Sequence, residues 1–171
     1  MKKILYILGI LSLGLLNSCQ KLPIEMTATV EMAGEWVVSV DASANGQVIY
    51  EDPYGFGTVK VFTSNSAANI ATEMLVLDDP DDPFWNFNCK VTADPANMSF
   101  SANAVENLAY DCEITITGGK IVKNGTKTPS GMPADYIEFH ILFSDDDTAA
   151  EGVWDDLFIH GYRYTGLASD N

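Results

Sequence analysis

The chain has 171 residues, and its 24 acidic side chains outnumber nine Lys and Arg, so its formal net charge at pH 7 is −15. This balance excludes nucleic acid as a partner, because a phosphate backbone needs basic groups that replace its counterions. The same balance disfavours electrostatic binding to anionic lipid headgroups.

The first nineteen residues carry the most informative motif. Lys2 and Lys3 precede an apolar run over 4–16, and the small residue Ser18 stands directly before Cys19. A positive start, a short apolar run and a small residue at the cleavage point are typical of a secretory signal peptide. The Leu-Asn-Ser-Cys run that ends at Cys19 resembles a bacterial lipobox. This resemblance implies cleavage before Cys19 and attachment of lipid chains, such as palmitate, to its thiol.

An ordinary signal peptide or a short membrane anchor is the alternative for this segment, although its apolar run is short for a bilayer span. We expect 1–18 to be a lipoprotein signal peptide, 19–32 a lipidated tether and 33–171 one domain. Removal of the signal leaves 153 residues with a net charge of about −17, which suits one hydrophobic core. Lipid chains on Cys19 anchor the protein to a membrane through their buried methylenes.

We expect this membrane to be the outer membrane of the cell envelope. Gln20 follows the cysteine where enterobacterial lipoproteins retained in the inner membrane carry aspartate. The sequence leaves open whether the protein faces the periplasm or the cell surface.

Short runs rich in Val, Ile, Thr, Tyr and Phe follow the tether, and turn residues separate them. Such runs predict β-strands, and a Gly-Gly pair between two of them predicts a tight hairpin at Gly118-Gly119. Residues 103–110 can form one or two helical turns. Strands are expected at 35–41, 47–51, 58–63, 69–77, 87–93, 98–102, 112–117, 120–123, 136–143 and 157–165.

Eight to ten short strands in one domain predict an all-β antiparallel sandwich or barrel. One constellation favours the barrel. Trp36 shares its strand face with Val38 and Val40, and Arg163 shares its face with Ile159. If the apolar faces point inward, both side chains lie inside, and closure makes the first and last strands neighbours. The Arg163 guanidinium can then cover the Trp36 indole as a cation–π pair that closes one end of the barrel.

This pair resembles the Gly-x-Trp motif and C-terminal Arg of the calycins, the group that contains the lipocalins. The resemblance implies a structural role for Gly34, Trp36 and Arg163. The lipobox, the run 33–38 and the closing run 161–166 together resemble a group of Bacteroidetes lipoproteins described as lipid-binding putative hydrolases. That resemblance implies a single up-and-down, calycin-like barrel of about eight strands. Leu167 departs from it, since an aromatic residue is expected there.

The first function hypothesis is non-covalent binding of a small hydrophobic ligand, such as a fatty acid or lipid fragment, inside the barrel. A site with few polar groups fits such a ligand, although the same side chains would also fill a ligand-free core. No cofactor and no metal ion is expected. The predicted lining is Val38, Val59, Val61, Met74, Phe87, Ile114, Ile137, Phe139 and Ile141.

Two other functions remain open. The loops can bind a protein partner or a glycan, through aromatic residues such as Trp85 and Trp154. Hydrolysis ranks last, because there is no Gly-x-Ser-x-Gly motif and no residue is assigned a catalytic role. His140 and His160 are out of phase with the apolar faces, so we expect them on the outer wall near Glu138.

The acidic runs 78–83 and 144–147 lack the ligand spacing of an EF-hand and are expected to be solvated loops. Cys89 and Cys112 both fall on the inward phase of their strands. Buried free thiols and a disulfide are both open for this pair, because no spacing rule shows that their Cα atoms approach.

Overall fold

The computed structural model describes residues 26–170. The predicted signal peptide, Cys19 and the first half of the predicted tether therefore lie outside the described residues. None of the helices within 26–170 is long and apolar enough to cross a membrane.

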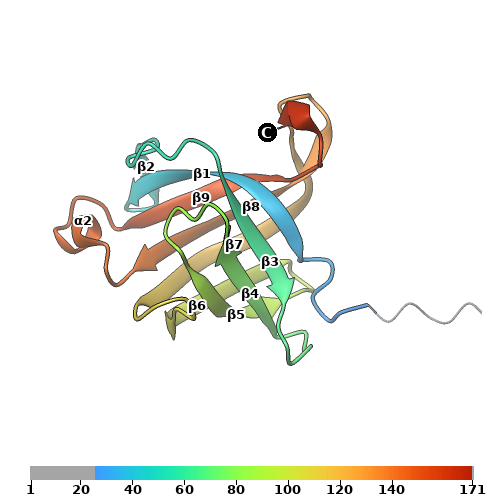
Figure 1. The fold of residues 1–171 in the computed structure, drawn as a ribbon, viewed down its shortest axis with the longest axis horizontal. Helices are drawn as coiled ribbons and strands as arrows, with labels where there is room; N and C mark the ends of the chain where they lie inside the picture. The colour runs from blue at the N-terminus through green and yellow to red at the C-terminus, as the bar shows by residue number, and fades with distance from the viewer. Residues whose placement is uncertain (1–25, 171) are drawn as a thin grey trace, which may run out of the picture.

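Eight antiparallel strands form a closed up-and-down barrel (Figure 1). Each strand pairs with the next along the chain, and β9 pairs with β1 to close the sheet. The predicted all-β barrel is thus confirmed. The barrel strands are β1 (Gly34–Ala44), β3 (Val59–Asn65), β4 (Glu73–Asp78), β5 (Asn88–Asp94), β6 (Ser99–Glu106), β7 (Glu113–Lys127), β8 (Pro133–Phe143) and β9 (Asp156–Arg163).

Three shorter elements lie outside the barrel wall. The strand β2 (Gln47–Tyr50) pairs only with the last residues of β1, and all four of its residues are exposed. The one-turn helix α2 (Asp147–Ala150) precedes β9, and a 3₁₀ turn (Ala168–Asp170) ends the described chain.

The interior is built by the period-2 alternation of the strands. In β5, for example, Cys89, Val91 and Ala93 are buried while the residues between them are more exposed. The inward side chains of all eight strands join in one hydrophobic cluster. Closure removes the free edges that an open sheet would expose.

The predicted hairpin at Gly118-Gly119 is wrong, because β7 continues through both residues. Gly118 has φ of 65°, and the register against β8 shifts between Thr117 and Lys120, so the pair forms a bulge within one long strand. A Cβ on Gly119 would lie 2.4 Å from the carbonyl oxygen of Phe100, so only glycine fits there. The region 103–110 is not helical: β6 continues to Glu106 and a bend follows.

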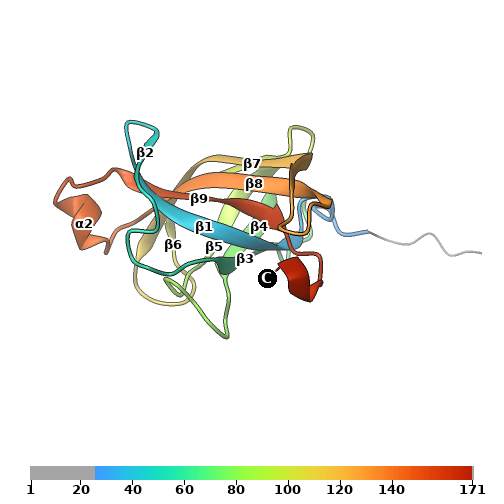
Figure 2. The same ribbon diagram turned by 90° about the horizontal axis from the view of Figure 1, so that it is seen from above.

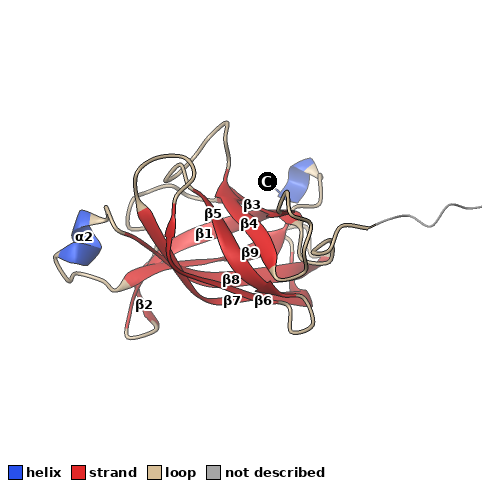
Figure 3. Ribbon diagram, turned by 90° about the horizontal axis from the view of Figure 1, so that it is seen from below, coloured by secondary structure: helices blue, strands red, loops and turns tan. Residues whose placement is uncertain are grey.

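The two ends of the barrel differ in what covers them (Figures 2 and 3). We call one end the base: both ends of the described chain lie there, with the loops 66–72, 95–98 and 128–132. The opposite end, the mouth, carries the loops 51–58, 79–87, 107–112 and 144–155, with α2 in the last of them.

Candidate functional site

The barrel interior holds the side chains that the sequence predicts as the ligand lining. Eight of the nine are buried and belong to the hydrophobic cluster, and Val59 packs against its edge. Aromatic rings from facing strands interlock among them. The ring centroids of Phe100 and Phe139 lie 5.6 Å apart, and those of Phe87 and Phe143 lie 5.6 Å apart. In this conformation the protein's own side chains fill the interior.

Strand side chains close the base. Arg163 and Trp36 are cross-strand partners, and the guanidinium carbon lies 4.3 Å from the indole ring centroid. The Arg163 Nη1 donates to the Ala33 carbonyl at 2.6 Å, and its Nε donates to Asp135 at 3.1 Å. A Cβ on Gly34 would lie 2.1 Å from the same Nη1, so glycine makes room for the guanidinium. The structure therefore brings the predicted trio of Gly34, Trp36 and Arg163 together.

The ion pair at the base also affects a carboxyl group. Burial alone would raise the pKa of Asp135, but a backbone hydrogen bond from Asn124 and the charges of Lys123 and Arg163 outweigh it and hold that pKa below its ordinary value. Trp36 is fixed from its other edge, where its Nε1 donates to the Thr63 hydroxyl at 2.8 Å. The Trp36 Nε1 group and the Arg163 Nε and Nη1 groups thus all have hydrogen-bond partners.

Loop side chains, by contrast, close the mouth. We call the five aromatic residues that cover it the aromatic cap. Trp85 stacks on Phe143 of the interior at 4.7 Å, and Tyr54 packs edge-on against both tryptophans at 5.4 and 5.7 Å. Phe84 links the cap to Phe87 inside the barrel. The aromatic cap consists of Tyr54, Phe56, Phe84, Trp85 and Trp154.

Two carboxylates of the second acidic run hold this cap. Asp146 is 3% exposed, so the prediction of a solvated loop is wrong for this residue. It accepts from the Tyr54 hydroxyl at 3.2 Å and from the Trp154 indole at 3.0 Å, and it caps the N-terminus of α2. Asp145 accepts from the Trp85 indole at 3.3 Å and from the Tyr110 hydroxyl at 2.7 Å.

The hydrogen bonds change the acidity of Asp145. Its partial burial would raise its pKa, but hydrogen bonds from Tyr110, Cys112 and Trp85 prevail and hold the pKa below the ordinary value. The carboxylate form of Asp145 is thus the one that fits the closed cap.

The first acidic run also differs from the expected solvated loop at its first residue. Asp78 is 4% exposed and accepts hydrogen bonds from the backbone N–H groups of Trp85 and Asn86, both at 2.8 Å. Burial raises the pKa of Asp78 despite these bonds. The side chain folds the loop back so that Phe84 and Trp85 reach the mouth.

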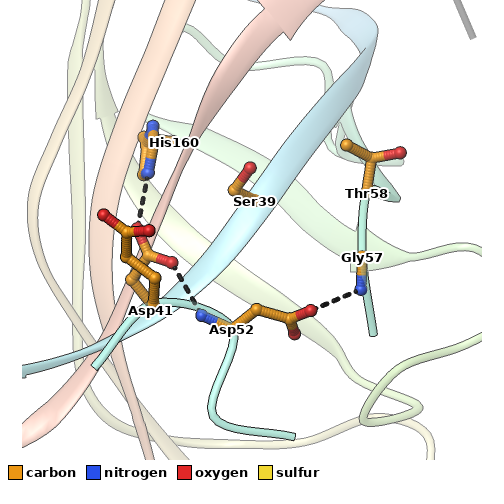
Figure 4. Close-up of a pocket in the computed structure, with 7 residues that line it drawn as sticks. Ser39, Asp41, Asp52, Gly57, Thr58 and His160 are labelled. Atoms are coloured by element: carbon orange, nitrogen blue, oxygen red, sulfur yellow. Dashed lines mark hydrogen bonds and ion pairs between the residues drawn. The ribbon is translucent and has the colours of Figure 1, made fainter. Parts of the chain in front are cut away.

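A cleft of about 440 Å³ lies on the outer wall beside the mouth (Figure 4). Within it, His160 Nε2 lies 2.9 Å from Asp41, and the other oxygen of Asp41 accepts from the Asp52 backbone at 3.1 Å. Asp52 in turn accepts from the backbone of Phe56 and Gly57. Asp41 therefore connects His160 to the loop that carries part of the aromatic cap. The cleft is lined by Ser39, Asp41, Glu51, Asp52, Gly57, Thr58 and His160.

The two histidines share the outer wall, as their phase predicts, but they do not touch. Phe158 lies between them, and its ring centroid is 4.9 Å from each imidazole. His140 Nδ1 lies 2.8 Å from Asp156 and 3.2 Å from the Ser43 hydroxyl, which itself donates to Asp156. Both partners thus use the same imidazole nitrogen.

That arrangement differs from a nucleophilic triad, in which hydroxyl and carboxylate bind opposite nitrogens of the imidazole. Ser43 is also buried, so a substrate does not reach its hydroxyl. In the cleft, Ser39 and His160 are cross-strand partners, yet no hydrogen bond joins them. The carboxylates of Asp41, Glu51 and Asp52 would oppose the oxyanion that ester cleavage forms. Neither histidine cluster is therefore arranged for acyl transfer.

The remaining predicted groups are readily placed. Cys89 and Cys112 are buried and free. Burial raises the pKa of the Cys89 thiol to about 12, so this thiol stays protonated at neutral pH. Within 26–170, no group of three or more His, Cys, Asp or Glu side chains is placed to hold a metal ion.

Sequence reasoning missed the roles of Asp41, Asp145 and Asp146. For Asp146 a signal was present, since Asp is a preferred helix N-cap and Asp146 directly precedes the run Asp147-Thr148-Ala149-Ala150. Asp41 lies on β1, and its partners His160 and Asp52 lie on β9 and in the loop after β2. No local sequence pattern therefore marks these contacts.

A family model described as lipid-binding putative hydrolase matches residues 21–168, which include every strand of the barrel. Among curated proteins, none matches the chain.

Proposed function

The chain belongs to the family described as lipid-binding putative hydrolases, and on this premise we propose that it binds a small hydrophobic ligand inside the barrel. A fatty acid or a lipid fragment is the kind of molecule that fits. The observation that carries the proposal is the contrast between an entirely apolar interior, a base closed by strand residues and a mouth closed only by loop residues.

The base is the poorer entrance. Arg163 reaches across it and is held at three points, by Trp36, Ala33 and Asp135. Both Arg163 and Trp36 belong to strands that are paired on both sides. Opening this end would break the ladder that closes the barrel.

The mouth is the better entrance, because the residues of its aromatic cap belong to loops, which can move without breaking the strand pairing of the barrel. A shift of Phe84 and Trp85 would uncover Phe87 and Phe143, which lie directly beneath them. A cleft of about 330 Å³ already runs between α2 and the end of β8, beside Trp154. An acyl chain gains about 0.8 kcal/mol for each methylene it buries, and the burial lost by the cap and core side chains that it displaces offsets part of this gain.

The proposal includes the cellular setting. The protein is a lipoprotein of Bacteroidetes type with a calycin-like barrel, anchored through Cys19 to the outer membrane. Residues 19–32 form the tether and 33–171 the domain. The motif that ends at Cys19 supports the anchor. Within the described part of the tether, Thr29 and Met32 are buried against the base, so the chain reaches the barrel at that end.

The proposed ligand site is tested at Trp36, which is buried at the bottom of the interior. The double variant Trp85→Phe and Trp154→Phe leaves Trp36 as the only tryptophan. A nitroxide-labelled acyl chain that enters the barrel should quench Trp36 fluorescence, whereas the water-soluble quencher acrylamide should not. Failure of the acyl chain to quench Trp36, with the circular dichroism spectrum of the barrel intact, would contradict the proposal.

A second function is docking of a protein partner or a glycan at the mouth. The exposed strand β2 favours it, since Val48, Ile49 and Tyr50 present large apolar side chains beside the mouth. If the partner is added in place of the acyl chain, this function predicts that Tyr50 becomes less accessible to acrylamide. The fluorescence of Trp36 should then stay unchanged.

A further inference from the structure

Charge is distributed very unevenly between the two ends of the barrel. The four mouth loops contain eleven Asp and Glu and no Lys or Arg. The segments that form the base contain two acidic residues, Glu31 and Asp170. The base ends of the strands add four acidic residues, Glu35, Glu73, Asp94 and Asp135, and four basic residues, Lys120, Lys123, Lys127 and Arg163. The large negative net charge is therefore a property of the mouth, which composition alone does not reveal.

Four of the acidic groups near the base, Glu31, Glu35, Glu73 and Asp135, pair with a cation, whereas Asp94 accepts from the Asn97 amide. Glu31 and Asp135 both lie within 3.5 Å of the Lys123 ammonium group, and Asp135 binds Arg163 as well. Asp170 accepts from the Ser130 backbone at 2.9 Å. A negatively charged surface would thus repel the mouth strongly and the base weakly.

The base also exposes large apolar side chains. They come from the N-terminal segment, the β3–β4 and β7–β8 loops and the C-terminal segment, and each is at least 38% exposed. Comparable side chains elsewhere in the described residues are Leu142 on the outer wall and, in or beside the mouth loops where eleven carboxylates also lie, Val48, Ile49, Tyr50, Tyr54, Leu108 and Val153. The exposed residues of the base are Met26, Val30, Ile70, Met132 and Leu167.

The chain outside the described residues attaches at this same end. The described chain begins at Met26, and two residues on, the Ala28 backbone N–H donates to Asn69 of the base loop 66–72 at 2.9 Å. From Cys19 to Met26 the chain can span at most about 25 Å. Lipid chains on Cys19 would therefore keep the base close to the bilayer.

We propose that the base is a membrane-contact surface that rests on the bilayer holding the Cys19 anchor, with the mouth facing away from it. The inference rests on the lipid anchor of the proposed function. Side chains such as Met132 and Ile70 enter the interfacial region, and Lys120 and Lys127 lie at the headgroups. The acidic mouth then opens into the aqueous phase.

The test uses the full-length lipidated chain in vesicles of phosphatidylethanolamine and phosphatidylglycerol. A nitroxide is attached at Met132→Cys or Ile70→Cys in the base, and at Leu108→Cys in the mouth as the matched control. All three native positions are exposed, and the buried Cys89 and Cys112 stay unlabelled. Collision of each nitroxide with oxygen, which concentrates in lipid, is compared with collision with a water-soluble nickel chelate.

The base labels are expected to favour oxygen several-fold over the Leu108→Cys label. Equal, water-like accessibility at all three positions on vesicle-bound protein would overturn the contact surface while leaving the anchor intact. Protein that does not float with the vesicles would contradict the anchor and the contact surface together. As a second variant, Met132→Asp with Ile70→Asp should lower oxygen accessibility at a Leu167→Cys label without preventing flotation, and unchanged accessibility would contradict the inference.

Discussion

Arg163 on the last strand holds its guanidinium carbon 4.3 Å from the ring centroid of Trp36, its cross-strand partner on the first strand. The pair joins the two ends of the barrel sheet. It also seals the base through hydrogen bonds from the two side chains to Ala33, Asp135 and Thr63. A barrel closed in this way opens more readily at the mouth, where loop side chains form the closure.

Replacing Arg163 with Ala should lower the free energy of unfolding by roughly 2–5 kcal/mol. The estimate combines about 0.5–2 kcal/mol for the cation–π contact with about 1.5–3 kcal/mol for hydrogen bonds to a charged group. Urea denaturation followed by circular dichroism gives the value. As a control, Lys90→Ala removes the exposed ion pair with Glu73 and should cost less than about 1 kcal/mol. Equal losses in the two variants would show that the base pair has no special role.

Gly161→Ala should prevent stable closure of the barrel. A Cβ on Gly161 would lie 2.0 Å from the Val37 carbonyl oxygen on β1, and β9 is paired on both sides, so neither strand can yield. We expect a loss of more than about 3 kcal/mol, the range reached by severe core strain. Gly152→Ala is the control, since it has open space around it and only its φ of 75° is unfavourable. Thermal unfolding of both variants is measured, and the melting temperature should fall much further in Gly161→Ala than in Gly152→Ala. Equal decreases would contradict the prediction.

Asp146→Ala should loosen the aromatic cap. It removes the acceptor shared by Tyr54 and Trp154 and the N-cap of α2, at a cost of about 1–2 kcal/mol in stability. Acrylamide quenching of tryptophan fluorescence should increase, and acyl ligands should enter faster. The neighbouring Asp147→Ala replaces an exposed carboxylate and should change neither rate. A cap that keeps its quenching rate in Asp146→Ala would show that other contacts hold it.

Acid should open the cap through Asp145. The pKa of Asp145 in the folded protein lies below the ordinary carboxyl value of about 3.9. Its contribution to stability is therefore fully present above about pH 5, and it is lost as the pH falls below 4 through the folded pKa. Trp85 fluorescence, measured between pH 6 and pH 2.5, should change in this window. In the Asp145→Asn variant, the fluorescence change below pH 4 should disappear. If the same fluorescence change persists in this variant, other carboxylates cause it.

Ligand charge should matter at the mouth. The eleven carboxylates of its loops disfavour an approaching anion, so a neutral acyl alcohol should bind more tightly than the fatty acid of equal length at pH 7. Raising the ionic strength should narrow the difference in Kd. Substitution of Asp79, Asp81 and Asp82 by Asn should narrow it as well. A fatty acid that binds as tightly as the alcohol at low salt would contradict this selectivity.

Residue alternation was sufficient to predict the barrel interior and the outer position of both histidines. Inward phase is a property of each strand alone, and closure then makes Trp36 and Arg163 neighbours. The Gly118-Gly119 signal failed because two glycines permit either a tight turn or a bulge. The choice depends on Phe100, which lies against Gly119 from the adjacent strand.

The mouth was harder to predict for a related reason. Whether an aspartate is solvated or buried depends on which donors other loops bring to it, and Asp145 and Asp146 receive theirs from three other loops of the mouth and from beyond α2. The same holds for Asp41, whose partners His160 and Asp52 come from β9 and the loop after β2.

Native mass spectrometry of the full-length protein, isolated from a lipid-producing host and compared with the denatured protein, tests the central claim most directly. Ligand binding inside the barrel predicts an additional non-covalent mass of a few hundred daltons that disappears on denaturation, and that is weaker in Asp146→Ala. A mass that matches the protein alone, unchanged after incubation with fatty acids and acyl alcohols, would show that the barrel stays filled by its own side chains and would contradict the claim.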